Sequence, residues 1–169
     1  MPSVTSSMIG VDLNNPSSTA LFALNTVVNG TDGSQWQYCI ATGTLTTGMF
    51  VQISDAGTAN AVTTAIQNAA TVPMLIGVAQ YTVAQGQYAF MAMRGQNLYV
   101  ACSGTIPQGV ELGLAPSSPG VLVTGAAAIA GSTMAGIFLE ASASTATASI
   151  AQATLQWPRF PLVGTSARG

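Results

Sequence analysis

The chain contains no histidine and no lysine, and three arginines and five acidic residues are its only charged side chains. Without histidine, Ser/His and Cys/His nucleophile systems and the usual imidazole zinc sites cannot form within one chain. Without lysine, there is neither a P-loop lysine nor a Schiff base. The five acids could in principle meet as a carboxylate pair or a Ca²⁺ site, but Asp32 lies in an Asn/Gly turn, where it is expected to cap its own backbone. We therefore expect no enzyme, no metal site and no cofactor.

The scarcity of charge also limits the partners. Nucleic-acid binding commonly needs about 6 or more phosphate contacts, which three arginines cannot supply. Charged residues make up 5% of the chain, against about 25% in ordinary soluble proteins. Such a surface must be covered by uncharged polar side chains, by copies of the same chain or by a larger assembly. A formal net charge of −2 gives little repulsion between copies, which favours assembly.

Cysteine and long apolar runs are equally sparse. Cys39 and Cys102 are too few for a disulfide framework and are interpreted as free buried thiols, although a bond between them stays possible. Residues 56–93 and 112–139 carry no charge, but Gly, Ser and Thr interrupt them, so no membrane span is expected. The first residues lack a cationic stretch followed by an apolar run, which predicts no signal-directed export.

Alternation with period two dominates the rest of the sequence and predicts an all-β fold, a small barrel or sandwich-like domain. Turn residues, among them Arg94-Gly95, separate the expected strands. Helical spacing of Ala59, Val62, Ile66 and Ala70, and the Ala-rich stretch 126–130, predict short helical or loop crossings. The expected strands cover residues 35–40, 49–54, 74–80, 87–93, 96–101, 110–114, 120–124, 136–141 and 146–155.

A weak internal repeat accompanies the alternation. The segment 43–51 (GTLTTGMFV) returns 61 positions later as 104–112 (GTIPQGVEL), and Val62-Thr63 returns as Val123-Thr124. We expect two copies, at about 43–95 and 104–156, within a β-rich domain spanning 19–156. Gly48 and Gly109 would occupy equivalent turns, so that replacing either with valine should cost about 1–3 kcal/mol, and the same at both sites.

The two ends lack this pattern. Residues 1–18 are predicted to form an extended arm, and residues 157–169 a tail in which two prolines prevent a central strand. We expect the arm to bind a partner through its backbone, and Trp157 and Phe160 to dock on a neighbouring subunit with Arg159 as a hydrogen-bond donor. The candidate interface residues are Ser3, Val4, Thr5, Met8, Asn14, Trp157, Arg159 and Phe160.

Short phrases of apolar residues and glycine follow one another along the chain: Gly43-x-Leu45-x-x-Gly48, Leu75-Ile76-Gly77-Val78-Ala79, Val83-Ala84-Gln85-Gly86, Gly104-x-Ile106-x-x-Gly109-Val110-x-Leu112 and Gly136-Ile137-Phe138-Leu139-Glu140. Their order resembles the capsid decoration (cement) proteins of tailed bacteriophages over about residues 35–155. The resemblance implies a structural virion protein that is made in the host cytoplasm and binds the outer surface of major capsid subunits, as a homotrimer.

A binding module of a phage head fibre or tail is the alternative. In that case exposed aromatic rings, either Trp36 and Tyr38 or Tyr81 and Tyr88, would stack on sugars instead of packing in a core.

Overall fold

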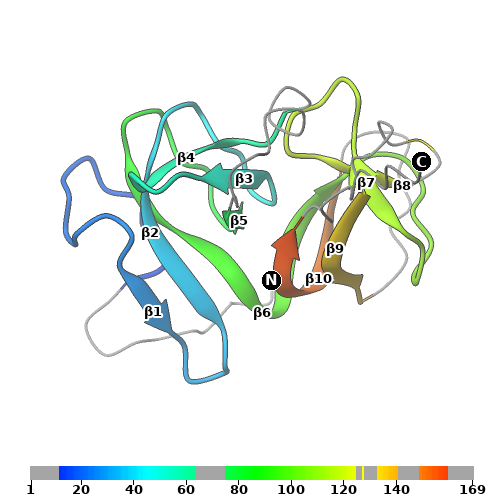
Figure 1. Cartoon of the computed structure of the whole chain (residues 1–169), viewed down its shortest axis with the longest axis horizontal. Coiled ribbons are helices and arrows are strands. Elements are labelled where there is room, and N and C mark those ends of the chain that lie inside the picture. The colour runs from blue at the N-terminus through cyan, green and yellow to red at the C-terminus, as the bar shows by residue number, and fades with distance from the viewer. Residues whose placement is uncertain (1–11, 64–74, 125–126, 128–132, 141–148, 160–169) are drawn as a thin grey trace, which may run out of the picture.

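Ten strands form one continuous sheet, which confirms the all-β class (Figure 1). The computed structural model describes residues 12–63, 75–124, 127, 133–140 and 149–159. The strands are β1 (Val27–Asn29), β2 (Gln35–Ala41), β3 (Phe50–Ile53), β4 (Thr58–Ala61), β5 (Leu75–Ala79), β6 (Tyr88–Cys102), β7 (Leu112–Leu114), β8 (Leu122–Thr124), β9 (Thr133–Leu139) and β10 (Ser149–Arg159).

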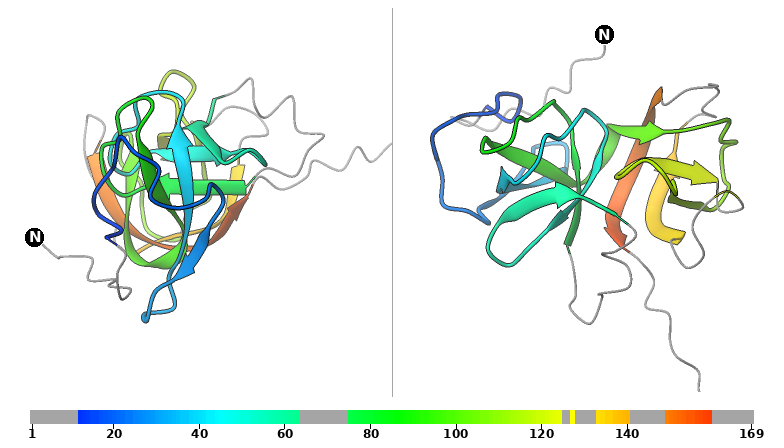
Figure 2. Two further views of the ribbon diagram at one scale, coloured as in Figure 1. Left: turned by 90° about the vertical axis from the view of Figure 1, so that its left-hand side faces the viewer. Right: turned by 90° about the horizontal axis from the view of Figure 1, so that it is seen from above.

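The sheet closes on itself twice, giving two five-stranded barrels that share β6. In the first barrel the order β2-β4-β3-β5-β6 returns to β2, and β1 extends β2 outside the ring. In the second barrel the order β6-β10-β9-β7-β8 returns to β6. Figures 1 and 2 show the barrels as two lobes joined by the long strand β6. Closure leaves few strand edges open to aggregation.

The pairings of the first barrel recur in the second with the same sense. The parallel pair β2–β4 matches β6–β8, and the four antiparallel pairs β3–β4, β3–β5, β5–β6 and β2–β6 match β7–β8, β7–β9, β9–β10 and β6–β10. At one position the strand pairings match residues of the two copies differently from the predicted sequence repeat. Because Val51 pairs with Ala61 and Leu112 with Thr124, Thr124 corresponds to Ala61 and not to Thr63. The pairings agree with a duplication, which stays a prediction together with the boundaries of the two copies.

Strand β6 contributes side chains to two buried clusters. Ala89, Met91 and Met93 pack in one buried cluster, whereas Leu98, Val100 and Cys102 pack in another. Phe90 and Ala92 belong to the same cluster as Leu98, so the even-numbered face of β6 packs in this cluster in both halves of the strand. The strand is distorted between the halves at Gly95 (φ +152°) and Asn97 (φ +55°). The predicted turn at Arg94-Gly95 is therefore wrong. The glycine marks a local distortion inside one continuous strand, a known role of glycine in strand interiors.

Hydrogen bonds beyond the strand ladders hold the two barrels together. The Gln80 side chain, 2% exposed, donates from Nε2 to the Tyr99 carbonyl (3.0 Å) and accepts from the Tyr99 amide (2.8 Å). The Ala101 amide donates to the Gly48 carbonyl (2.8 Å), and the Phe50 amide donates to the Gly120 carbonyl (2.9 Å). Buried hydrogen bonds of this kind fix the relative position of the barrels.

The helical pattern predicted around Ala59 is wrong, because Ala59 lies in β4, where it pairs with both β2 and β3. Strand pairing and complete burial override a weak helical spacing at this alanine. Val62 directly follows β4 and is 1% exposed. Ile66 and Ala70 lie outside the described residues, as does the stretch 126–130 except Ala127.

The two predicted ends are partly built into the barrels. In the arm, Leu13 is 4% exposed within the main core, and Ser17 pairs with Tyr88. At the other end, β10 continues through Trp157 and Pro158 to Arg159. Pro158 fits because the register of β9 and β10 is broken between Leu155 and Arg159, and a bulge is a place where a strand tolerates proline. The expectation that the prolines prevent a central strand is wrong at Pro158.

Candidate protein-contact surfaces

Asp32, Cys39 and Cys102, whose side chains could in principle take part in chemistry, lie either in a turn or in the core. The Ser34 amide donates to Asp32 Oδ1 (2.9 Å), confirming the predicted turn cap. Partial burial raises the pKa of Asp32, but hydrogen bonds from Ser34 outweigh it and hold that pKa below its ordinary value. Cys39 and Cys102 are free and buried, as predicted, and burial raises the pKa of the Cys39 thiol to about 12 and that of Cys102 to about 11. Both thiols are thus poor nucleophiles.

The described residues contain neither a cluster of metal ligands nor a membrane-spanning helix. No three His, Cys, Asp or Glu side chains among them lie close enough to hold a metal ion. No helix in the described part of the chain is long and apolar enough to cross a membrane.

The predicted interface residues fall into three groups. Ser3, Val4, Thr5, Met8 and Phe160 lie outside the described residues. Arg159 ends β10, and its side chain is not described. The described remainder consists of Asn14, whose Oδ1 accepts a hydrogen bond from the Tyr81 hydroxyl, and Trp157, which is 46% exposed. Asn14 thus helps to hold the root of the arm on its own barrel.

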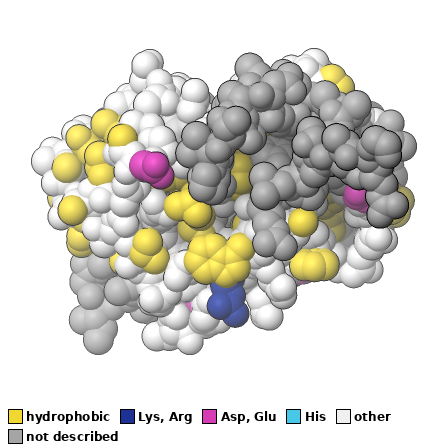
Figure 3. Space-filling view, in the orientation of Figure 1, with side chains coloured by type: hydrophobic (Ala, Val, Ile, Leu, Met, Phe, Trp, Pro, Cys, Tyr) yellow, Lys and Arg dark blue, Asp and Glu magenta, His cyan; other side chains and the backbone are white. Residues whose placement is uncertain are grey.

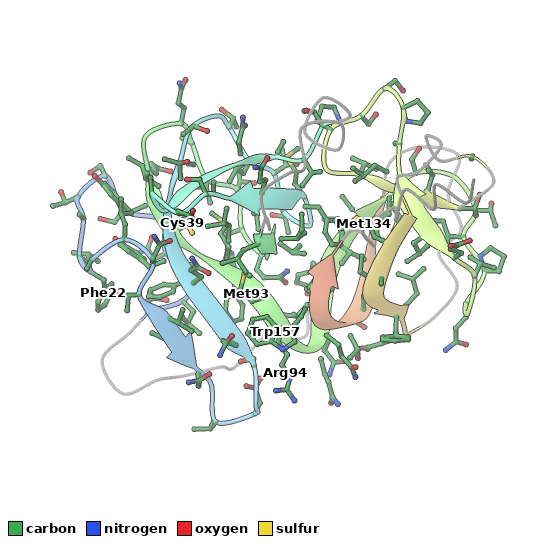
Figure 4. The ribbon with its side chains drawn as sticks, viewed as in Figure 1. Phe22, Cys39, Met93, Arg94, Met134 and Trp157 are labelled. Carbon is green, nitrogen blue, oxygen red and sulfur yellow. The ribbon has the colours of Figure 1, made fainter. Side chains whose placement is uncertain are left out.

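Trp157 projects from the seam between the barrels. Its backbone has φ +54°, a region that residues other than glycine rarely adopt, while the next residue, Pro158, is buried. The neighbouring Gln156 pairs with Arg94 of β6. Figure 4 shows Trp157 beside the exposed Arg94, and Figure 3 shows hydrophobic atoms adjoining the basic side chain on this face. Trp and Arg are enriched at the centres of protein interfaces. We call Trp157 and Arg94 the seam surface.

A groove in the second barrel forms another contact surface, which the sequence did not single out. Its volume is about 370 Å³, and residues 108–111 face residues 137–139 of β9 across it. Phe138 is 57% exposed and Val110 39% exposed at its walls. Alternation in β9 could have indicated Phe138, because Ile137 and Leu139 are buried and the side chain between them must point outward.

Two of the aromatic residues considered for sugar stacking are core residues. Trp36 is 0% exposed and donates from Nε1 to Ser34 Oγ (2.9 Å), and Tyr38 is 2% exposed. The ring of Tyr88 stacks on Tyr38, with 6.0 Å between centroids. A sugar platform on Trp36 and Tyr38 is excluded, because neither ring has a free face. The other predicted pair stays a prediction: Tyr81 and Tyr88 are both half-buried, and the Tyr81 hydroxyl donates to Asn14.

Comparison with known proteins finds no family model that matches the chain and no match among curated proteins.

Proposed function

We propose that this chain is a structural virion protein that decorates and stabilises an icosahedral phage capsid. In this proposal it binds the outer surface of major capsid subunits as a homotrimer, after synthesis in the host cytoplasm. It acts by adding protein contacts repeated over many copies, without catalysis, cofactor, nucleic-acid binding or membrane attachment.

The seam surface carries the proposal. Trp157 exposes apolar ring surface to water, and burying that surface against a partner would be favourable. A strained left-handed backbone holds the ring in this exposed position. Such strain persists where the surrounding structure enforces it, and it is common at binding sites. The resemblance over residues 35–155, the low charge and the rigid all-β body are consistent with a protein whose task is contact with other proteins.

We assign the seam surface to the capsid. The sequence alone suggested a neighbouring subunit as the partner of Trp157. The seam lies where both barrels and β6 meet, so a contact made there is transmitted to the whole rigid body. A planar guanidinium beside the indole can donate to carboxylates or carbonyls of the shell.

Co-sedimentation with heads that lack the decoration protein tests the proposal. We expect the chain to bind such heads and Trp157→Ala to weaken binding at least tenfold, because tryptophan anchors dominate interface energies. Leu75→Ala is the matched control, since Leu75 in the first barrel is 45% exposed, nearly the same as Trp157.

Three results would count against parts of this proposal. Wild-type protein that does not bind heads would refute the decoration function. Equal binding by Trp157→Ala and Leu75→Ala would move attachment away from the seam. A monomer by light scattering at micromolar concentration would refute the homotrimer.

A further inference from the structure

The two barrels differ in the hydrogen bonds made by the segment that leads into β3 in the first barrel and into β7 in the second. In the first barrel, the Ala79 amide donates to the Met49 carbonyl (3.0 Å), and the Gly48 amide donates to the Ala79 carbonyl (2.7 Å). These bonds join the end of β5 to the segment that leads into β3.

In the second barrel, the segment leading into β7 and the end of β9 are not joined in this way. Pairing of β7 with β9 begins only at Leu112 and Met134, and within the described part of the chain no hydrogen bond joins Leu139 to Gly109 or Val110. The groove separates these residues instead. Among the described residues, β9 beyond Met134 therefore has no strand partner on this side, and Gln108 Nε2 donates to the Glu140 carbonyl (3.2 Å) at one end of the groove.

The backbone of Leu139 points into this groove. On its other side β9 pairs with β10, where the Glu140 amide donates to the Gln152 carbonyl (3.0 Å). Hydrogen-bonded and non-hydrogen-bonded pairs alternate along an antiparallel ladder, so Phe138 also bonds toward β10, whereas Ile137 and Leu139 direct their amide and carbonyl groups away from it. The groove therefore presents backbone donors and acceptors beside the exposed Phe138 ring.

This arrangement fits one added extended strand. A strand inserted along Ile137–Leu139 would gain main-chain hydrogen bonds, and its alternate side chains would contact Phe138 and Val110. An unprotected edge with exposed apolar neighbours is otherwise a site of aggregation, which proteins cover.

We propose that the occupant is residues 2–11 of a second copy of this chain, and this rests on the homotrimer in the proposed function. The segment PSVTSSMIGV has no charge, and Val4, Thr5, Ile9 and Val11 are strong strand formers. Ten residues can span about 33 Å when extended, and the groove needs only three to five of them. The segment therefore has length to spare for crossing between subunits.

The position of Asp12 points to exchange between copies. Its neighbour Leu13 is buried in the core, and Ser17 pairs with Tyr88 in the first barrel. Figure 2 shows this end of the described chain on the first barrel, away from β9 in the second. An arm from one copy entering the groove of the next is a head-to-tail contact, which closes into a ring when the rotation permits. A trimer is one such ring.

Disulfide trapping in the full-length chain tests this contact. We expect Val4→Cys protein mixed with Val110→Cys protein to form a covalent dimer under mild oxidation. The matched control is Val27→Cys, because Val27 in β1 is also well exposed, at 48%, and should give no more dimer than random collision. Cys39 and Cys102 are buried and should not interfere.

A second variant, lacking residues 2–10, keeps Leu13 and should retain the wild-type circular dichroism spectrum while its mass falls to that of a monomer. Equal trapping at Val110 and Val27, or an intact trimer without the arm, would overturn the inference. Head binding separates the two proposals: trapping without head binding refutes only the decoration function, and head binding without trapping refutes only the arm exchange.

Discussion

Gly48 and Gly109 offer a matched pair for testing how tertiary context changes the cost of one substitution. Both have the left-handed backbone that the sequence predicted, with φ +82° and +80°. A Cβ at Gly48 would lie 2.7 Å from the Ala101 amide nitrogen and 2.9 Å from the Val100 carbonyl carbon, whereas a Cβ at Gly109 would have no atom within 4 Å. The equal cost predicted from the sequence is therefore no longer expected.

Alanine at Gly109 should lower the free energy of unfolding only through the left-handed backbone conformation, by about 1–2 kcal/mol. Alanine at Gly48 should have the same backbone cost and should also displace the backbone of β6, which adds about 1–3 kcal/mol for overpacking. It also weakens the bond from the Ala101 amide to Gly48 (2.8 Å), a further loss of about 1 kcal/mol. We expect totals of about 1–2 kcal/mol at Gly109 and about 3–6 kcal/mol at Gly48.

Urea unfolding followed by tryptophan fluorescence measures both values, because Trp36 is completely buried. The midpoint should fall much further for Gly48→Ala than for Gly109→Ala at an unchanged slope. Costs within about 0.5 kcal/mol of each other would refute the argument from close backbone approach. A larger cost at Gly109 would contradict the backbone geometry itself.

Three further predictions concern the barrel junction, the thiols and the arm. Gln80→Leu should lower the free energy of unfolding by about 2–3 kcal/mol in urea, because it removes both bonds to the β6 backbone; an unchanged midpoint would show that the barrels are held together elsewhere. Stability should fall as the pH rises above 9, because an unfolded thiol ionises near its ordinary pKa of 9.0 while the folded pKa values of Cys39 and Cys102 are raised to about 12 and about 11; Cys39→Ala should flatten this decline, and an equal slope in the variant would exclude this thiol as its cause. Leu13→Ala should cost about 2–4 kcal/mol by thermal or urea unfolding, because Leu13 is a core residue; a loss below 0.5 kcal/mol would mean that the root of the arm is not packed in solution.

Local pattern was sufficient for most strands. The alternation around residues 35–40 and 49–54 corresponds to β2 and β3, and the strands expected at 87–93 and 96–101 are the two halves of β6. Alternation is a property of neighbouring residues, so it survives whatever the strands later pair with. Weak segments such as β4 were missed, because Ala59 gains its strand conformation from partners on both sides.

The candidate site was less predictable. Trp157 was selected from the sequence as a contact residue, but the pairing of Gln156 with Arg94, which brings that arginine beside it, follows from the closure of the second barrel. The groove has no local signal of its own, because it arises between residues 108–111 and 137–139, which lie far apart in the chain. Trp36 and Tyr38 looked available for stacking, yet the strands and loops around them cover both rings.

By itself, the sequence determined the all-β class, the left-handed glycine turns, the buried thiols and the lack of histidine and lysine chemistry, because each depends on residue type or on nearest neighbours. Only the tertiary structure decided that one strand serves two barrels, that Pro158 sits in a bulge, and that one turn glycine is crowded while its counterpart is not. These depend on pairings between residues far apart in the chain. The atoms that face a given side chain are set by which strands close the barrel, and no local pattern contains that information.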